Sequence, residues 1–284
     1  MAIIGAYILP HGSMVLDLEK EGLPKEAIDL HNAMVEMAGE IEKLQPDIIF
    51  MTTPHSIALS NDFGIYLNKG GSGSAEWKGE YKKYKTSIEF DQEISQNLLD
   101  YLIDKETAIN GVVTFTASAD APLRWGEVVP LWFLRNLTKQ PKYILLSQPL
   151  RRLEYAEDLI PETLTLGNDL RLFFDNLDKR VVILISADMG HTHHKEGPYG
   201  FHELAEQFDE LMEKWAGKLD SKILIKKAAP MLTKALCCGY IGYVMLQGMI
   251  EHKNFTPKVI SRSAPTYYGM MVASYTNDVE EDEE

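Results

Sequence analysis

Short apolar runs alternate along this chain with longer segments of helical periodicity. The clearest runs are residues 3–9, 48–53, 142–147 and 181–186, which are rich in Ile, Val and Leu. Runs of this length and composition are typical of buried strands in a parallel sheet. Between the first two, residues 24–43 carry apolar side chains at three- and four-residue steps with Glu and Lys among them, the pattern of an amphipathic helix. The pattern therefore predicts strand–helix–strand units.

The rest of the chain continues this alternation without a linker rich in Pro, Gly or Ser. We predict an α/β fold: a single domain over residues 1–276 with a mixed, mostly parallel central sheet flanked by helices. Residues 68–85 are rich in Gly, Lys and Tyr, and we expect a flexible surface loop there. Further helices are predicted over 90–103, 161–177, 201–215 and 223–250 (broken at Pro230), and further strands over 112–116, at Val259 and over 270–275.

Charge and cysteine content narrow the functional classes. The formal net charge is −14, and six acidic residues lie in the last seven positions, so we expect residues 277–284 to be an acidic disordered tail. This balance argues against nucleic-acid binding, which needs clustered Lys and Arg. No apolar stretch approaches the roughly 20 residues that span a bilayer. The only cysteines, Cys237 and Cys238, are adjacent, so no disulfide framework is expected and a cytoplasmic location fits.

Three histidines each follow the end of a predicted strand. His11 comes after residues 3–9, His55 after 48–53, and His191 after 181–186. Ligands of open α/β sheets bind beyond the carboxyl ends of the strands, so these imidazoles are expected at one edge of the sheet. A pair of histidines suits Zn, Fe, Cu or Ni and does not name the metal.

At these motifs the sequence resembles the catalytic (B-type) subunits of class III extradiol ring-cleavage dioxygenases. The branch it resembles most is the one found with AMMECR1-type domains, together with the related Memo proteins. The matching pieces run nearly from end to end of the chain in a consistent order. They are Ala6-Tyr-Ile-Leu-Pro-His11, Thr53-Pro-His55-Ser56, Val129-Pro-Leu-Trp-Phe-Leu134, Ser186-Ala-Asp-Met-Gly-His191, Gly197-Pro-Tyr-Gly200, Cys238-Gly239 and Gly269-Met-Met-Val-Ala273.

The resemblance implies a single-domain α/β fold and a mononuclear non-haem Fe(II) site. In that family two His and one Glu hold the metal, which binds a catecholic diol and O₂. His11 and His55 match the two histidine ligands, and His191 matches the acid–base histidine. Imidazole titrates near neutral pH and can both accept and donate a proton, which suits that role.

Two departures from the family pattern bear on the chemistry. Cys237 stands where the family has its Glu ligand, and a thiolate shifts metal preference towards Zn or Cu(I). Memo proteins are likewise understood to have a His/His/Cys pocket. The alternative is that Cys237 is a small buried residue packed in a core helix. At the second departure, Arg124-Trp125 replaces the family's Asp-His, so Trp125 lacks the function of that histidine.

The sequence therefore supports a dioxygenase-like oxidoreductase with metal ligands His11, His55 and Cys237 and with His191 as acid–base. As an enzyme it would bind a small aromatic substrate and O₂. We expect no nucleic-acid or membrane partner, and the sequence leaves open whether the protein forms a homo-oligomer. The alternative is a Memo-like metal-binding protein that does not cleave rings, and a Zn hydrolase ranks third. His193 and His194 are expected to be exposed loop residues.

Overall fold

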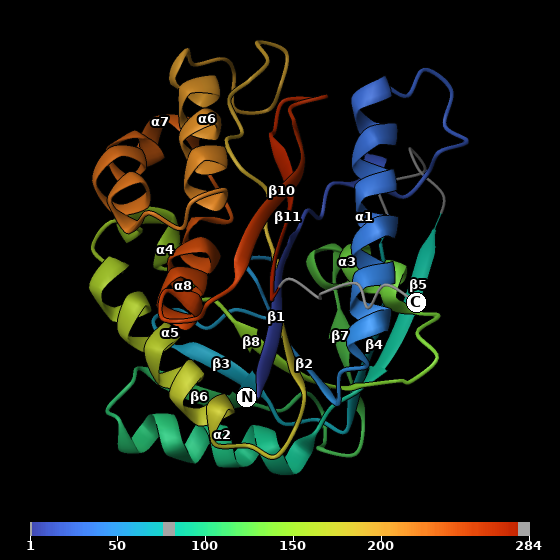
Figure 1. Ribbon diagram of the computed structural model, residues 1–284, viewed down its shortest axis with the longest axis vertical. Helices are drawn as coiled ribbons and strands as arrows, with labels where there is room; N and C mark the ends of the chain where they lie inside the picture. Colours follow the sequence, from blue (N-terminus) through green and yellow to red (C-terminus); the bar gives the residue numbers. More distant parts are fainter. Residues whose placement is uncertain (1, 76–82, 278–284) are drawn as a thin grey trace, which may run out of the picture.

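The computed structural model describes residues 2–75 and 83–277, and an eight-stranded mixed sheet forms their centre (Figure 1). Its strands are β1 (Ile3–Leu9), β2 (Ile48–Thr53), β3 (Phe63–Tyr66), β6 (Ile109–Val112), β8 (Lys142–Ser147), β9 (Val181–Ser186), β10 (Thr256–Ser263) and β11 (Met270–Thr276). They lie in the order β10-β11-β1-β9-β2-β8-β3-β6. The central strands β1, β9, β2 and β8 are parallel, whereas β11 and β3 pair antiparallel with β1 and β8. The prediction of a single α/β domain with a mixed, mostly parallel sheet is confirmed.

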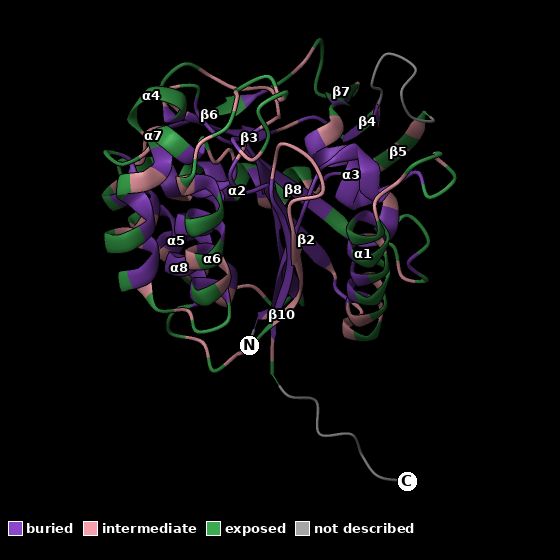
Figure 2. Cartoon of the chain, turned by 90° about the horizontal axis from the view of Figure 1, so that it is seen from above, coloured by how far each residue is buried: buried purple, intermediate pink, exposed green. Residues whose placement is uncertain are grey.

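Helices cover both faces of this sheet, as Figure 2 shows. Side chains alternate between the faces of a strand, so Ile183 and Ile185 of β9 join one apolar cluster and Val182 and Leu184 join the other. The first cluster includes residues of helices α2, α5, α6 and α8, and the second includes residues of α1 and α3. The helices are α1 (Lys25–Leu44), α2 (Gln92–Asp104), α3 (Trp125–Leu134), α4 (Arg152–Tyr155), α5 (Ile160–Asp175), α6 (Leu204–Ala216), α7 (Leu232–Ala235) and α8 (Tyr240–Ile250).

The predicted loop over 68–85 is instead largely a second, three-stranded sheet. It consists of β4 (Gly70–Ala75), β5 (Tyr84–Glu89) and β7 (Asp120–Leu123), in the order β5-β4-β7. The glycines of β4 are needed for close packing: a Cβ on Gly73 would lie 2.1 Å from the Leu123 carbonyl oxygen. The Gly-rich composition therefore reflects close approach of two backbones, and the prediction of a flexible loop is wrong for the described residues. Residues 76–82 of that prediction lie outside them.

The predicted helix over 223–250 is broken, but not at Pro230. A π-helical segment (Ile223–Ala228), a 3₁₀ turn (Ala229–Met231) and α7 follow one another, and Pro230 lies in the first turn of the 3₁₀ segment, where proline is tolerated. The break comes at Leu236, which adopts a left-handed conformation (φ 55°, ψ 48°). Cys237 and Cys238 therefore lie in an irregular connection before α8 and not in a helix.

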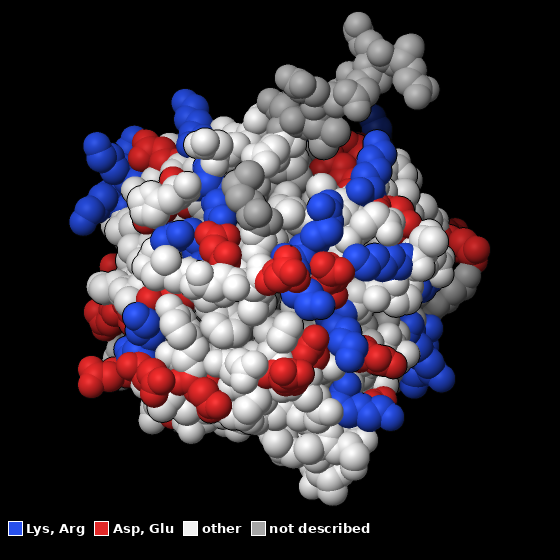
Figure 3. All heavy atoms as spheres, turned by 60° about the horizontal axis from the view of Figure 1, so that its bottom comes forward, with Lys and Arg blue, Asp and Glu red and all other residues white. Residues whose placement is uncertain are grey.

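Two other predictions concern a strand at the edge of the sheet and the C-terminal tail. The strand predicted over 112–116 lies earlier, as β6, and only Val112 belongs to both ranges. The predicted tail, 277–284, lies outside the described residues apart from Asn277. No helix within residues 2–75 and 83–277 is both long and apolar enough to cross a membrane. On the face shown in Figure 3, Lys and Arg side chains are interspersed with Asp and Glu.

Candidate metal centre

His11 lies two residues beyond β1 and is almost fully buried. Its Nδ1 is 3.0 Å from Ser186 Oγ, and the Ser186 hydroxyl donates to the Gly126 carbonyl oxygen at 2.5 Å. Since the serine has one proton and donates it to that carbonyl, its oxygen accepts from the Nδ1–H of His11. This contact fixes the tautomer and leaves Nε2 unprotonated, the state a metal ligand requires. Burial, followed by the nearby imidazole of His55, lowers the pKa of His11 well below its usual value.

His55 follows β2 and Pro54, and its ring meets that of His11 edge-on at a centroid distance of 4.8 Å. On its other side the ring packs against Trp125 at 4.8 Å. The backbone of Gly126 also approaches closely, because a Cβ there would lie 2.9 Å from the Cβ of His55. Burial, with a smaller contribution from the charge of Arg152, lowers the pKa of His55 to about 3, so the ring is neutral near pH 7.

The N-terminus of α3 therefore supports both histidines. Gly126 accepts the hydrogen bond from Ser186 behind His11, and Trp125 packs on His55. Arg124 is exposed, with its guanidinium 5.9 Å from the centre of the Trp125 ring. The residues that depart from the family pattern thus form a surface Arg and a packed Trp beside the site.

The sulfur that lies with the two histidines belongs to Cys238. One donor atom from each of His11, His55 and Cys238 lies within 4.8 Å of the others, and Cys238 Sγ is 3.5 Å from His11 Nε2. Cys237, the ligand expected from the sequence, is not in this group. Its Sγ lies 3.5 Å from the Asp188 carbonyl oxygen, and its half-buried side chain packs against the first apolar cluster while also bordering the adjacent cavity. The geometry therefore favours Cys238 as the sulfur donor and the packing alternative for Cys237.

Cys238 lies beside the histidines, and Cys237 does not, for a local structural reason. The left-handed Leu236 ends the helical path, so the directions of the two following side chains cannot be read from a helical pattern. Gly239 then packs tightly on the segment after β9, where a Cβ would lie 2.5 Å from the Cβ of Ala187. Its N–H donates to the Asp188 carbonyl oxygen at 3.2 Å, which holds Cys238 beside His11.

Asp188 is a buried carboxyl group at the site that sequence reasoning missed. Its Oδ1 accepts the backbone N–H of His11 at 3.0 Å, and its Oδ2 lies 3.3 Å from His11 Nε2. Burial raises the pKa of Asp188 to about 7. A signal was present, because Asp188 is two residues past β9, at the same sheet edge as the histidines.

His191 lines the same cavity as His55. Its Nδ1 is 2.8 Å from the Met189 carbonyl oxygen, which can only accept, so Nδ1 carries the proton and Nε2 is free. Burial lowers the pKa of His191 to about 4. The ring stacks on Tyr268 at a centroid distance of 5.6 Å. His191 is therefore a neutral, oriented proton acceptor near the donor group.

The loop that carries His191 is held by hydrogen bonds to the buried carboxyl group of Asp209. Asp209 of α6 accepts the N–H of Gly190 at 2.9 Å and contacts Nε2 of His193 at 2.9 Å. A Cβ on Gly269 would lie 1.8 Å from Asp209 Oδ2, so this position requires glycine. The expectation that His193 is exposed is wrong, whereas His194 is exposed.

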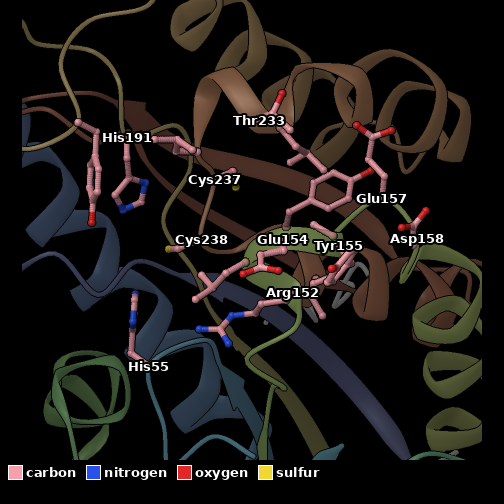
Figure 4. A pocket seen from close by; sticks show the side chains of 17 residues that line it. His55, Arg152, Glu154, Tyr155, Glu157, Asp158, His191, Thr233, Cys237 and Cys238 are labelled. Carbon is pink, nitrogen blue, oxygen red and sulfur yellow. The ribbon is translucent and has the colours of Figure 1, made fainter. Parts of the chain in front are cut away.

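His55, His191 and Cys238 line a cavity of about 470 Å³. Figure 4 shows His55, His191 and Cys238 around one end of it, with Glu157 and Asp158 at the other. The walls also include Arg152, Tyr199 and Ile241. The volume suits a small organic molecule.

Two nitrogens and one sulfur this close together fit a transition-metal ion. At His11 the contact with Ser186 leaves Nε2 unprotonated, and this atom faces Cys238 Sγ. The described residues thus form an α/β protein with a candidate metal site at the carboxyl edge of its sheet.

Comparison with known proteins agrees with this description. The family model described as the catalytic LigB subunit of aromatic ring-opening dioxygenase matches residues 5–276, and the chain belongs to this family of metal-dependent dioxygenases. Protein CA_C1420 of Clostridium acetobutylicum is 24% identical over 289 residues, covering 98% of this chain. The alignment spans 59% of that relative's own length. The crystal structure of uncharacterized protein JW3007 from Escherichia coli K12 shares the fold, with a TM-score of 0.57 at 11% identity, covering 95% of this chain and 99% of that one.

Removing the hydrogen bond behind His11 is expected to weaken metal binding without unfolding the protein. Ser186→Ala frees the imidazole to adopt the other tautomer, and loss of such an outer contact typically lowers metal affinity about 10- to 100-fold. Zn(II) competition titration against a chelating dye measures this change. Ser147→Ala is the matched control, since Ser147 is equally buried at the end of β8. Equal affinities for both variants and the native protein would contradict the role given to Ser186.

Glu127 is a buried carboxyl group in the first turn of α3. Its Oε2 accepts the Arg124 backbone N–H at 2.8 Å. Burial dominates and raises the pKa of Glu127 to about 8. The folded state therefore holds this proton more tightly than the unfolded state, whose carboxyl has a pKa near 4.5. Stability is accordingly lost as the pH rises from about 4.5 through about 8.

Glu127→Gln should remove this pH dependence, because an amide side chain does not ionise. Its oxygen can still accept the Arg124 N–H, so the contact at the start of α3 is kept. The native protein loses stability between pH 6 and pH 9 and the variant does not. The difference in free energy of unfolding is therefore expected to change in favour of the variant by on the order of 1–3 kcal/mol over this range. Denaturant unfolding at several pH values measures the difference. Parallel stability curves for the two proteins would show that Glu127 ionises normally.

Proposed function

We propose that the protein is a ring-cleaving oxidoreductase whose metal ion is held by His11, His55 and Cys238. The observation that carries this proposal is the group of three donor atoms, of which those of His55 and Cys238 belong to residues that line a cavity of substrate size beside His191. Family membership supports the reaction class. Fe(II) is the metal that the family resemblance implies, while the sulfur donor also suits Zn or Cu(I). A bound Fe(II) would supply the redox chemistry that the reaction of O₂ with an aromatic diol requires.

The chain itself contributes proton transfer and positioning. The free Nε2 of neutral His191 can accept a proton from a diol hydroxyl and later return it, the work of a general acid–base. The bond from Nδ1 to the Met189 carbonyl holds the ring in that orientation. His11 and Asp188 are almost fully buried, which keeps water from the side of the site that faces away from the cavity.

A Memo-like metal-binding protein without ring-cleaving activity is the second candidate. It is favoured by one observation: Trp125 occupies the place of a family histidine and packs on His55, where it can neither donate nor accept a proton as imidazole does. In that case the same three ligands would hold copper or iron without oxidising a diol.

Oxygen uptake separates the two functions. Protein loaded anaerobically with Fe(II) is mixed with catechols in air-saturated buffer, and O₂ consumption and the absorbance of ring-opened product are followed together. The proposal predicts one O₂ consumed per diol with formation of the coloured product. Stoichiometric metal with no O₂ uptake on any catechol would contradict ring cleavage and support the second candidate. Hydrolysis of esters by the Zn(II)-loaded protein would instead point to a hydrolase.

A further inference from the structure

Three tyrosines form a continuous group of aromatic rings with His191. The ring of Tyr268 stacks on His191 at a centroid distance of 5.6 Å, and Tyr267 meets Tyr268 edge-on at 4.8 Å. Tyr199 contacts both Tyr267 and His191, each at 6.1 Å. Tyr267 and Tyr268 are half-buried, whereas Tyr199 is 57% exposed. The rings therefore lead from His191 to the protein surface.

The inner end of this group lies against the candidate metal centre. A Cβ on Gly12 would lie 2.6 Å from Cε2 of Tyr268 and 2.8 Å from its hydroxyl oxygen, so the phenol packs on the residue that follows His11. A residue with a side chain at position 12 would not permit this approach. Tyr268 thus contacts the neighbour of a metal ligand on one side and His191 on the other.

The outer end is built by the segment Gly197-Pro-Tyr-Gly200, to which the proposed function assigns no role. A Cβ on Gly197 would lie 2.5 Å from the Cβ of Tyr267, so this segment packs directly on Tyr267. Gly200 has a φ of 71°, a left-handed conformation that glycine adopts without strain. The segment therefore holds Tyr199 against Tyr267 while more than half of the Tyr199 surface stays in solvent.

Tyrosine is suited to carry an oxidising equivalent between such positions. One-electron oxidation of a phenol is accompanied by loss of its proton and gives a neutral radical. An electron passes readily between aromatic rings that are in or near contact, so an oxidising equivalent can move from Tyr268 to Tyr267 and on to Tyr199. Because Tyr199 is exposed, it can release its proton to water, and small reductants can reach the radical.

Trp125 provides no equivalent path, although its ring packs on His55 at 4.8 Å. The Arg124 guanidinium lies 5.9 Å from the centre of the indole, and a positive charge there disfavours removal of an electron from the ring. Among residues 2–75 and 83–277, the only aromatic ring that contacts Trp125 is that of His55. An oxidising equivalent on Trp125 would therefore have no further ring to move to.

We infer that Tyr268, Tyr267 and Tyr199 form a radical-transfer path that carries an oxidising equivalent from iron at the candidate centre to the protein surface. The inference rests on the metal part of the proposed function and not on ring cleavage. Its role is to consume, at Tyr199, an oxidant that finds no substrate. The path thereby spares the Cys238 sulfur, which peroxide would otherwise oxidise.

Hydrogen peroxide is the oxidant of this step, since incomplete reduction of O₂ produces it. Its O–O bond breaks as it takes up two electrons and two protons and leaves as two molecules of water. One electron comes from bound Fe(II), which becomes Fe(III). The second electron and one proton come from Tyr199, which becomes a neutral tyrosyl radical, and the other proton comes from solvent.

Radical trapping tests the inference on the native protein. Protein loaded anaerobically with Fe(II), without substrate, is mixed with equimolar hydrogen peroxide and a nitroso spin trap, and peptide mass spectrometry locates the adducts. Most adduct is expected on Tyr199. Tyr155 is the internal reference, because it borders the same cavity and is 53% exposed but contacts no aromatic ring in the described part of the chain. Equal adducts on Tyr155 and Tyr199, or a main adduct on Trp125, would overturn the inference.

Variants then test the path itself. Tyr267→Phe keeps the ring packing and removes the phenol, so the Tyr199 adduct should fall to a small fraction while oxidation of Cys238 to sulfinic acid rises. Tyr268→Phe should have the same effect, and Tyr155→Phe, the matched control, should change neither quantity. Iron content and thermal unfolding are measured first for each variant. An undiminished Tyr199 adduct in both path variants, or an adduct in Zn(II)-loaded native protein, would overturn the path.

Because the trapping experiment contains no catechol, its outcome is independent of ring cleavage. A Tyr199 adduct in iron-loaded protein that consumes no O₂ with any catechol would support the path and contradict the proposed function. Ring cleavage by iron-loaded protein that forms no Tyr199 adduct would leave the proposed function standing and overturn the path.

Discussion

Cys238→Ala is expected to lower metal affinity by more than about 100-fold, whereas Cys237→Ala changes it by less than about threefold. The first change removes one of three donor atoms, an effect larger than the 10- to 100-fold typical of outer contacts. The second removes a half-buried side chain that packs against the apolar core and lies outside the donor group, so its effect should appear in stability. Zn(II) competition titration, with thermal unfolding of the metal-free proteins, separates the two effects.

Because the two cysteines are adjacent, each variant serves as the control for the other. Both sulfurs lie near the Asp188 carbonyl oxygen, at 3.5 and 3.7 Å, so the two variants remove similar groups from neighbouring positions. Loss of metal in Cys237→Ala and retention in Cys238→Ala would restore the ligand expected from the sequence. Equal retention in both would leave the two histidines without a sulfur partner.

His191→Ala is expected to abolish turnover while leaving metal affinity nearly unchanged. The imidazole is neutral and oriented by Met189, so it is suited to accept a proton from a bound diol. Loss of a positioned acid–base typically lowers the rate about 10²–10⁴-fold. Oxygen uptake by Fe(II)-loaded protein measures the rate, and dye competition measures the metal.

The comparison with the ligand histidines makes this prediction specific. His11→Ala and His55→Ala should lose metal and turnover together. If His191→Ala also released the metal, His191 would be a ligand and not an acid–base. If its turnover matched that of the native protein, another group would have to carry the proton.

The sequence predicted the central strands of the main sheet because these strands are buried on both faces, whereas β3 was not predicted. Residues 48–51 and 181–185 are apolar at consecutive positions, which is typical of a strand covered on both faces. The second sheet was missed since β4 is composed of Gly, Ser and Ala, a composition normally typical of loops. Its glycines are set by contacts with Leu123, some 50 residues away, which no local pattern reveals.

The site was predictable to the extent that it follows strand ends. This rule placed His11, His55 and His191 at one edge of the sheet. In the structure His55 and His191 line one cavity, and the buried His11 lies close to both. The choice between Cys237 and Cys238 depends on a left-handed residue at Leu236, a conformation that leucine rarely adopts.

The central claim is that His11, His55 and Cys238 bind one metal ion together. X-ray absorption spectroscopy of Zn(II)-loaded protein at one equivalent tests it most directly, with Cys238→Ala measured alongside. The account predicts one sulfur at about 2.3 Å and two imidazole nitrogens at about 2.0–2.1 Å in the native protein, and loss of the sulfur in the variant. A native spectrum without sulfur, or a sulfur that persists in Cys238→Ala, would contradict it.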